Sequence, residues 1–329
     1  MTSRVGVGLW FKAAISVAVL TVVLLRVDLS SVADAFAGVD WPLFLLTVGL
    51  TAPLGFTGIQ RWRLVATTFG ESLPIFKALT YTWIGQFINL GFPSLLGLDS
   101  VRAWKMHKQG ITLGLATRIV LVDRLTSLFT LLIVIAIALP HLWTFKGSEL
   151  FRQSATLVFA LGCTALLGLS SVEWIARANC ANGPLKHLHQ LGKDFNSTLF
   201  GDPGVTLKIS AWSILNHLCR VAIVFSLARA LGLSISALDT FVLVPSALLI
   251  AMVPITLAGW GVREVVFIHA FSLAGVSSID ALALSLLYGL VFLVTGLVGG
   301  AVWFAERRLH KQGSRHLQPG VTRERRSVV

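Results

Sequence analysis

The stretch PSLLGLDSVR, residues 93–102, interrupts an apolar chain, and PITLAGWGVR, residues 254–263, interrupts it again in a similar way. Each stretch begins with a proline, continues with small residues and reaches an arginine nine positions after the proline. Proline lacks a backbone N–H and glycine weakens a helix, so both stretches predict breaks in helices. Broken helices at corresponding places in two halves of a chain are typical of transporters, in which they border the substrate site.

The composition around these breaks is that of a membrane protein. The chain has 329 residues, a mean hydropathy of +0.80 and 13% charged residues. Soluble proteins carry roughly 25% charged residues. Several apolar runs reach the roughly 20 residues that a helix needs to cross a bilayer. The sequence therefore predicts an all-α, polytopic membrane helix bundle.

The apolar runs divide into full crossings and two shorter hairpins. We expect full crossings at residues 9–25, 41–59, 115–139, 155–174, 207–231 and 281–304. The runs 75–90 and 237–253 are each followed by a break and a short second limb. We expect these to form two re-entrant hairpins on opposite sides of the membrane, in the manner of inverted repeats. If both limbs of each hairpin cross, the number of crossings rises from six to eight.

The net charge of +12 comes from lysines and arginines that lie between the apolar runs and in the C-terminal tail. Cytoplasmic loops are enriched in these residues. The pattern thus predicts an inner-membrane protein with both termini in the cytoplasm, and it gives no reason to expect a nucleic-acid partner. We expect a transmembrane domain over residues 1–312, with a polar cytoplasmic loop between residues 174 and 207. Residues 313–329 should form a disordered basic cytoplasmic tail.

The first apolar run has some features of a secretion signal. A short motif of small residues, Ala35-Phe36-Ala37, resembles a cleavage site. It lies far beyond the end of the apolar run, however, and charged residues stand between. We therefore expect the run to remain as an uncleaved first helix.

Charged residues within membrane segments are costly and are therefore candidates for function. Asp99 and Arg102 would share a face of the helix that follows the first break. One interpretation is that Asp99 caps this helix and Arg102 anchors it at the cytoplasm. The other is that the helix N-terminus and the arginine together bind a lipid phosphate.

Arg263 and Glu264 follow the second break. Because they are adjacent, we expect them to point in different directions and not to neutralise each other. Each would then form a structural ion pair with another helix or contribute to a binding path.

Asp123 and Arg124 are a second adjacent pair, inside an expected crossing. They need partners elsewhere, and we favour Arg102 or Glu264. They form either a buried structural pair or part of the path.

Arginines also mark the second and fifth expected crossings. Arg61 and Arg63 lie at the expected cytoplasmic end of residues 41–59. They would act as snorkelling anchors or would collect anionic headgroups. Arg220 lies deeper in residues 207–231 than Arg229 does, and we expect it to be the one that lines a cavity.

No signature of cofactor, metal or catalytic chemistry stands out. His187 and His189 have no further ligands nearby, and there is no Walker A motif. Neither a Ser/His/Asp order nor a paired-carboxylate pattern is evident. The three cysteines have no CxxC spacing, which argues against a disulfide framework. We expect no cofactor, no metal and no enzyme activity.

Three motifs together resemble the lysylphosphatidylglycerol synthase transmembrane region, a flippase-like family of integral membrane proteins. They are GFP through DxxR at residues 91–102, VDRL at residues 122–125, and P through GxGVRE at residues 254–264. Two departures from the family pattern are Leu96-Gly97-Leu98, where paired glycines are often found, and Asp123, where glutamate is frequent. The resemblance covers nearly the whole chain and implies lipid translocation, with re-entrant helices and charges along a headgroup path. On that path it places Asp99, Arg102, Asp123, Arg124, Arg263 and Glu264.

Bifunctional members of this family carry a soluble aminoacyl-transferase half, whereas this sequence ends in a short basic tail. The resemblance therefore implies a stand-alone member that does not make lysylphosphatidylglycerol. Stand-alone members are similar to proteins linked with hopanoid, polyprenyl-glycolipid and cell-envelope lipid handling. The expected partner is thus a membrane lipid, either a phospholipid, a hopanoid or a polyprenyl-linked lipid. A homo-oligomer is a further option.

The leading hypothesis is a lipid flippase or lipid transporter of the bacterial inner membrane. The candidate substrate-binding residues are Asp99, Arg102, Asp123, Arg124, Arg263, Glu264, Arg61 and Arg63. The alternative is a membrane-embedded transferase that acts on a polyprenyl lipid or phospholipid, with Glu264 as its acid or base. A third option is a non-transporting assembly factor that makes contacts through its basic tail, Gly313–Val329.

Overall fold

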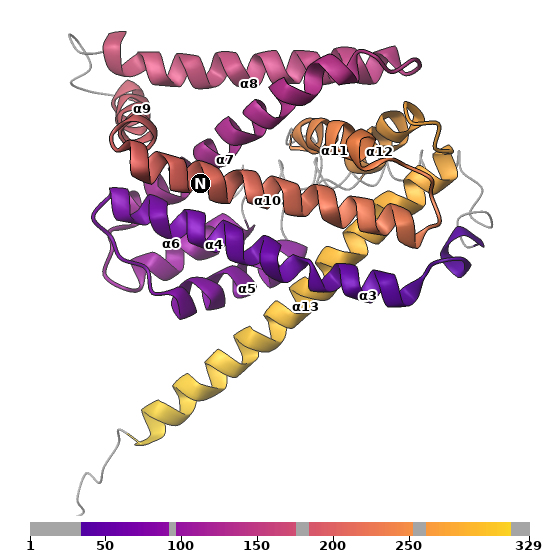
Figure 1. Ribbon diagram of the computed structural model, residues 1–329. Coiled ribbons are helices and arrows are strands. Elements are labelled where there is room, and N and C mark those ends of the chain that lie inside the picture. The colour runs from indigo at the N-terminus through magenta and orange to yellow at the C-terminus, as the bar shows by residue number, and fades with distance from the viewer. Residues whose placement is uncertain (1–33, 92–96, 176–183, 253–260, 317–329) are drawn as a thin grey trace, which may run out of the picture.

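The computed structural model describes residues 34–91, 97–175, 184–252 and 261–316, and these form helices and turns without a strand. Pro93, Pro254 and the expected first crossing lie outside the described residues. The helices, shown in Figure 1, are α3 (Trp41–Gly49), α4 (Thr51–Thr68), α5 (Ile75–Gly91), α6 (Gly97–His107), α7 (Leu113–Leu142), α8 (Glu149–Ile175), α9 (Pro184–Phe200), α10 (Pro203–Ala230), α11 (Ala237–Ala251), α12 (Val262–Ser272) and α13 (Ser278–His316).

Five stretches of the described chain are long and apolar enough to cross a membrane. They are Trp41–Thr68, Leu113–Leu142, Glu149–Val172, Pro203–Ala230 and Ser278–Glu306. Each coincides with an expected crossing, so these five expectations are confirmed as long apolar helices. The chain is a multi-pass membrane protein.

Two boundaries differ from those expected. The helix expected to end at Ile59 continues through α4 to Thr68, so Arg61 and Arg63 lie inside it and not at its end. Helix α13 extends to His316, and the rest of the expected tail, residues 317–329, lies outside the described residues.

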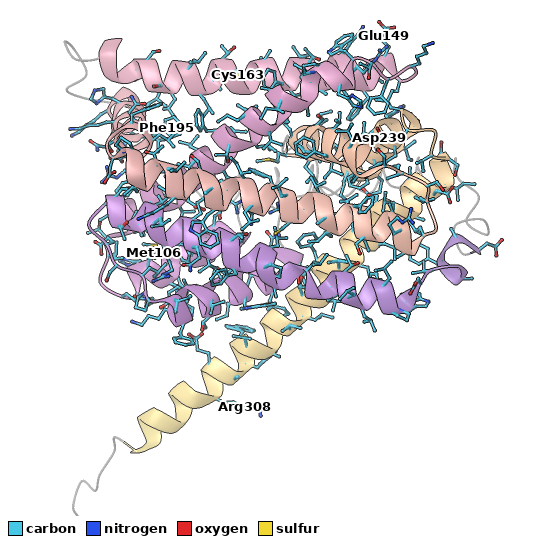
Figure 2. All side chains as sticks on the ribbon, in the orientation of Figure 1. Met106, Glu149, Cys163, Phe195, Asp239 and Arg308 are labelled. Carbon is cyan, nitrogen blue, oxygen red and sulfur yellow. The ribbon has the colours of Figure 1, made fainter. Side chains whose placement is uncertain are left out.

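The loop expected between residues 174 and 207 contains a helix, α9. Its apolar side chains Leu191, Phe195 and Leu199 recur every four residues and share one face, which packs into the core beside α7 and α8 (Figure 2). The opposite face carries exposed Lys186 and Lys193. The high polar content of the segment concealed this periodicity, because an amphipathic helix is polar over much of its surface.

The helices pack in two corresponding sets. In the first set α4 and α5 are neighbours, α5 pairs with α6, and α6 packs on α7. In the second set α10, α11, α12 and α13 repeat these contacts in the same order. Helix α4 packs on α10 and joins the two sets. The first helix of each hairpin also packs on the last helix of the other set, so that α5 contacts α13 and α11 contacts α7.

The turns that lead into and out of the hairpins also correspond. A glycine with positive φ follows each long helix before the hairpin, Gly70 after α4 and Gly232 after α10. Another follows each short limb, Gly110 after α6 and Gly275 after α12. Helices α6 and α12 both have 11 residues. In this alignment of the two sets, Asp99 corresponds to Glu264, because each is the third residue of its helix. The proline-to-arginine spacing in the sequence had instead suggested that Arg102 corresponds to Arg263.

Each set encloses its own apolar core. A cluster that includes Trp62, Met106 and Ile119 fills the space between α4, α5, α6 and α7. A larger cluster that includes Leu227, Phe267 and Leu284 fills the space between α10, α11, α12 and α13. The central cavity described below is lined by residues of both sets.

Close backbone approach fixes the first hairpin against its neighbours. A Cβ atom on Gly97 would come within 2.8 Å of the Cα atom of Asn89, so this glycine allows α6 to fold back on α5. On α13, a Cβ atom on Gly299 would overlap the backbone carbonyl of Trp83 in α5. Small residues at helix contacts allow such close packing in membranes.

We predict that Gly299→Ala lowers stability although alanine is the better helix former. Overpacking costs about 1–3 kcal/mol, whereas the gain in helix propensity is about 1 kcal/mol. The matched control is Gly168→Ala on α8, where a new Cβ atom meets nothing within 4 Å. Thermal unfolding of the full chain in detergent should show a lower midpoint for the first variant only. Equal midpoints would contradict the close packing of α5 on α13.

Candidate functional site

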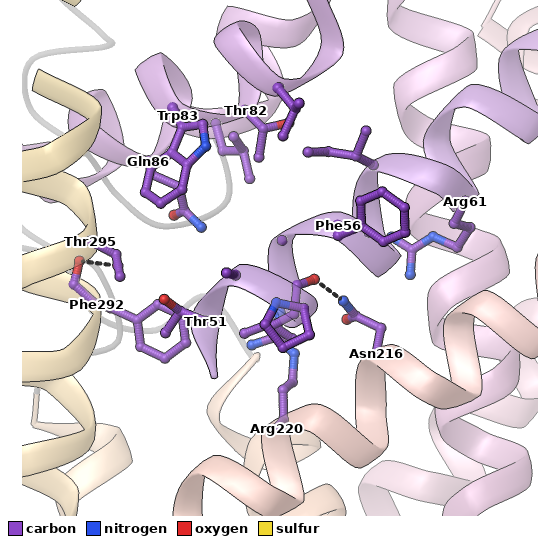
Figure 3. Close-up of a pocket in the computed structure, with 18 of the residues that line it drawn as sticks. Thr51, Phe56, Arg61, Thr82, Trp83, Gln86, Asn216, Arg220, Phe292 and Thr295 are labelled. Atoms are coloured by element: carbon purple, nitrogen blue, oxygen red, sulfur yellow. Dashed lines mark hydrogen bonds between the residues drawn. The ribbon is translucent and has the colours of Figure 1, made fainter. Parts of the chain in front are cut away.

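A cavity of about 570 Å³ lies between the two sets of helices (Figure 3). Helices α4, α5, α10 and α13 form most of its wall, and α6 and α7 each add an arginine. Its polar lining side chains are Thr51, Arg61, Thr82, Gln86, Arg102, Arg124, Asn216, Arg220 and Thr295. A hollow with four arginines at membrane depth is costly without an anion, which makes it the candidate functional site.

Asp123 on α7 binds two of these arginines. Arg61 Nε donates to Asp123 Oδ1 at 2.8 Å, and Arg61 Nη2 donates to Oδ2 at 3.2 Å. Arg102 Nη1 lies 3.5 Å from Oδ2. The side chain of Asp123 is only 1% exposed, and both arginines are buried as well. The expectation that Arg102 pairs with Asp123 is confirmed, whereas the expected alternative partner, Glu264, lies elsewhere.

The role of Arg61 is a correction to the sequence analysis. As α4 continues to Thr68, Arg61 lies within a packed helix, where it is 4% exposed and bound to Asp123 and does not extend outward as an anchor would. Arg63 points differently, because residues two positions apart lie on different faces of a helix. It donates to the carbonyl of Leu73 at 2.7 Å and to Gln60 Oε1 at 2.7 Å, and it does not line the central cavity.

Arg102 has two further contacts that hold it in place. Its Nη2 donates to Thr82 Oγ1 on α5 at 3.2 Å, and its guanidinium lies 4.6 Å from the ring centroid of Trp62 on α4. Two buried donors near the cavity, Arg61 Nη1 and Arg102 Nε, have no hydrogen-bond partner among the described residues. An unpaired buried donor favours a ligand that carries acceptor oxygens.

The other acid of the site, Asp99 on α6, binds Arg124 on α7. Arg124 Nε and Nη2 donate to the two carboxylate oxygens of Asp99 at 2.7 and 2.8 Å. Asp99 therefore pairs across helices and not with Arg102 on its own helix face. The adjacent residues Asp123 and Arg124 do point in different directions, as the sequence predicted. Neither Asp99 nor Asp123 lines the cavity itself, so the acids lie behind the arginines.

Arg220 on α10 differs from the other three lining arginines, each of which has an ion pair with an aspartate. It is half-buried and forms no hydrogen bond or ion pair with any described residue. Figure 3 shows its side chain extending from α10 toward the cavity, next to the helix that carries Thr51 and Phe56. The site thus has four guanidinium groups and two carboxylates, a surplus of two positive charges.

Asn216, one turn before Arg220, fixes α10 to α4. Its side-chain amide donates to the carbonyl of Leu54 at 2.7 Å and to Thr57 Oγ1 at 2.9 Å (Figure 3). The sequence analysis placed Arg220 in a cavity but gave Asn216 no role. An asparagine within an apolar helix was the available signal, since polar side chains at membrane depth usually bond across helices.

The second charged pair, Arg263 and Glu264, lies outside the central cavity. Arg263 Nη2 donates to Glu264 Oε1 at 2.6 Å, so the expectation that these neighbours cannot neutralise each other is wrong. Glu264 turns back to accept from the backbone N–H of Gly261 at 2.6 Å, as in a capping box. The long arginine side chain can therefore reach its carboxylate. Arg263 Nε also donates to Ser285 on α13 at 3.1 Å.

The two halves differ at the corresponding positions. The register of the hairpins places Phe267 where the first half has Arg102, and Tyr288 where it has Asp123. The ring centroids of Phe267 and Tyr288 lie 5.9 Å apart. An aromatic contact in the second half thus takes the place of an ion pair in the first. The cationic site belongs mainly to one half of the molecule.

In the described ranges, no three His, Cys, Asp or Glu side chains gather as a metal site would require. In a comparison with protein families, the model described as the lysylphosphatidylglycerol synthase TM region matches residues 9–300. No curated protein matches the chain.

We predict that Asp123→Asn destabilises the protein more than Asp99→Asn. The first change leaves Arg61 and Arg102 buried without a counter-charge, and removal of one partner from a buried pair costs about 3–5 kcal/mol. Asp99 is less buried, at 16% exposed. Thermal unfolding in detergent measures both effects. A second change, Arg61→Gln, should recover part of the loss in Asp123→Asn, and an equal effect of the two single variants would contradict this assignment.

Proposed function

The chain belongs to the lysylphosphatidylglycerol synthase TM region family, whose members are membrane proteins involved in lipid handling, and we propose that it transports a lipid with an anionic headgroup across the membrane. In this proposal the headgroup passes through the central cavity while the acyl chains stay in the bilayer. The bacterial inner membrane, with both termini in the cytoplasm, is the proposed location.

The observation that carries the proposal is that Arg220, in a cavity with surplus positive charge, has no ion pair with any described residue. Charged groups at membrane depth are normally paired, and no described residue neutralises Arg220. A lipid phosphate would supply both the missing charge and the acceptor oxygens for Arg220, Arg61 Nη1 and Arg102 Nε. A neutral lipid headgroup could supply acceptor oxygens but not the missing charge.

The acids of the site act as positioning groups in this mechanism. Asp123 holds Arg61 and Arg102, and Asp99 holds Arg124, each from behind the cavity wall. Their charge also limits the positive potential of the site. A site with four unopposed arginines would bind a phosphate too tightly to release it, and conduction requires that a ligand can leave.

We propose that the hairpins α5–α6 and α11–α12 are re-entrant. Helices α6 and α12 have 11 residues each. At a rise of about 1.5 Å per residue this gives roughly 17 Å, short of the roughly 30 Å hydrocarbon core. The corresponding packing of the two sets and their similar turns support an internal repeat. Transport would then proceed by rocking of one half against the other around the cavity.

The alternative of a membrane-embedded transferase would use Glu264 as its acid or base. Both oxygens of this carboxylate are already engaged, one by the N–H of Gly261 and the other by Arg263. Glu264 does not line the central cavity. We therefore propose transport in preference to group transfer, with Glu264 as a structural cap of α12.

We predict that Arg220→Gln slows translocation of fluorescent phosphatidylglycerol in proteoliposomes about ten-fold or more. Loss of one charge-assisted hydrogen bond is worth about 1.5–3 kcal/mol, and about 1.4 kcal/mol corresponds to a factor of ten. The matched control is Arg229→Gln, which removes an exposed arginine from the same helix. Folding should be unchanged in both, because neither arginine has an ion pair with a described residue.

Two results would contradict the transport proposal. One is a wild-type rate equal to that of empty liposomes, and the other is an equal effect of the two arginine variants. Product analysis of the same lipids separates the alternatives. If the wild-type protein forms a chemically modified lipid and the Glu264→Gln variant does not, the protein is a transferase instead.

A further inference from the structure

A second, larger cavity of about 1020 Å³ lies on the opposite side of the α5–α6 hairpin from the central one. On α5, Leu79, Thr82 and Gln86 line the central cavity, whereas Lys77 and Tyr81 line the second. These positions fall on opposite faces of a helix with 3.6 residues per turn. The second cavity is therefore a separate space, and the transport proposal does not use it.

The second cavity lies at one end of the apolar span of α13. The cavity is bordered by the first turn of α5, the last turns of α6 and the end of the apolar part of α13. The apolar span of α13 ends at Glu306, which lines the cavity together with Trp303. Phe76 and Trp104 also line it and are 80% and 51% exposed. Aromatic rings in such positions lie at the level of lipid headgroups.

The charge of this cavity is positive. Lys77, Lys105 and Lys108 line it, and Glu306 is the only acid among its lining residues. Lys77 and Lys108 are exposed and form no hydrogen bond or ion pair with any described residue. Lys108 Nζ lies 5.7 Å from the ring centroid of Trp104. Two positive charges are therefore available to a ligand.

Lys105 is held in place, which distinguishes the cavity from a set of mobile surface lysines. Its Nζ donates to both carboxylate oxygens of Glu306, at 2.7 and 2.5 Å, and thereby links α6 to α13. The same atom lies 5.4 Å from the ring centroid of Tyr81 on α5, whose hydroxyl accepts from Gln109. Three helices thus fix one ammonium group at the floor of the cavity. One N–H of this group remains free to bind a ligand.

We propose that this cavity binds the headgroup of an anionic phospholipid from the surrounding leaflet. The phosphate would lie between Lys105 and Lys108, and an acyl chain would run along the exposed rings of Phe76 and Trp104. The exposed apolar rings favour a lipid over a soluble phosphate, which would gain nothing from them. The site is distinct from the transport cavity and does not depend on transport.

The experiment uses bromine quenching of tryptophan fluorescence in the full chain. The protein is placed in nanodiscs of phosphatidylcholine that contain a rising fraction of brominated phosphatidylglycerol. We expect a saturable component of quenching that Trp104→Phe reduces and that Trp104→Phe combined with Trp303→Phe removes. We also expect Lys77→Gln combined with Lys108→Gln to raise the half-saturating fraction of the lipid about ten-fold, because lysines near a membrane surface contribute strongly to anionic-lipid binding.

The matched control removes two positive charges from another surface. Lys186→Gln combined with Lys193→Gln changes two exposed lysines of α9. The half-saturating fraction should stay within about two-fold of wild type, because neither lysine lines the cavity. Neither double variant removes a hydrogen bond between described residues, so both should fold as wild type does.

Three results would overturn the proposal. Brominated phosphatidylcholine that quenches Trp104 as effectively as phosphatidylglycerol would indicate contact with bulk lipid only. An equal shift for the two double variants would indicate non-specific surface charge. Displacement of the lipid by millimolar glycerol phosphate would assign the site to a soluble ligand. Quenching reports binding alone, so a failure of transport in proteoliposomes leaves this test unaffected.

Discussion

The neutralisation of Asp123 by two arginines is the interaction on which the site depends. The acid comes from α7, Arg61 from α4 and Arg102 from the α5–α6 hairpin, so one buried carboxylate connects a long helix of the first set with the short limb of its hairpin. None of the three charges could be buried there alone, because an isolated ion in a membrane interior is costly. The hairpin is therefore fixed by an ion pair at the same place where it borders the cavity.

The two halves of the molecule share a backbone plan and differ in chemistry. Corresponding turns and helix contacts indicate the shared plan. At equivalent positions, however, the first half has Arg102 and Asp123, and the second has Phe267 and Tyr288. The second half keeps one ion pair, Arg263 with Glu264, which closes on itself at the start of α12. The charged residue that lines the cavity from the second set is Arg220, which has no ion pair with any described residue.

Both cavities adjoin the same hairpin. One face of α5 lines the central cavity and the other lines the cavity at the membrane surface. The contact of α5 with α13 is close because Gly299 leaves room for the backbone of Trp83, and the salt bridge between Lys105 and Glu306 connects α6 to the same helix. The α5–α6 hairpin is therefore held on one side by backbone packing and surface charge, and on the other by the buried charges around Asp123.

Hydropathy and local residue types determined much of this protein. Long apolar runs set five of the crossing helices, since a helix that satisfies its own backbone is the economical way to pass through lipid. Proline, glycine and nearby charges marked both hairpins, and Asp99, Arg102, Asp123 and Arg124 were recognised from their depth in the membrane. Helix α9 was missed because its many polar residues concealed a narrow apolar face. The end of α4 was missed because Arg61 is buried only by its tertiary contact with Asp123. The pairing of the charges was decided by tertiary structure alone. Which arginine meets which acid depends on distances between helices far apart in sequence. That Arg220, unlike the other three arginines of the cavity, has no acid partner among the described residues follows only from these distances.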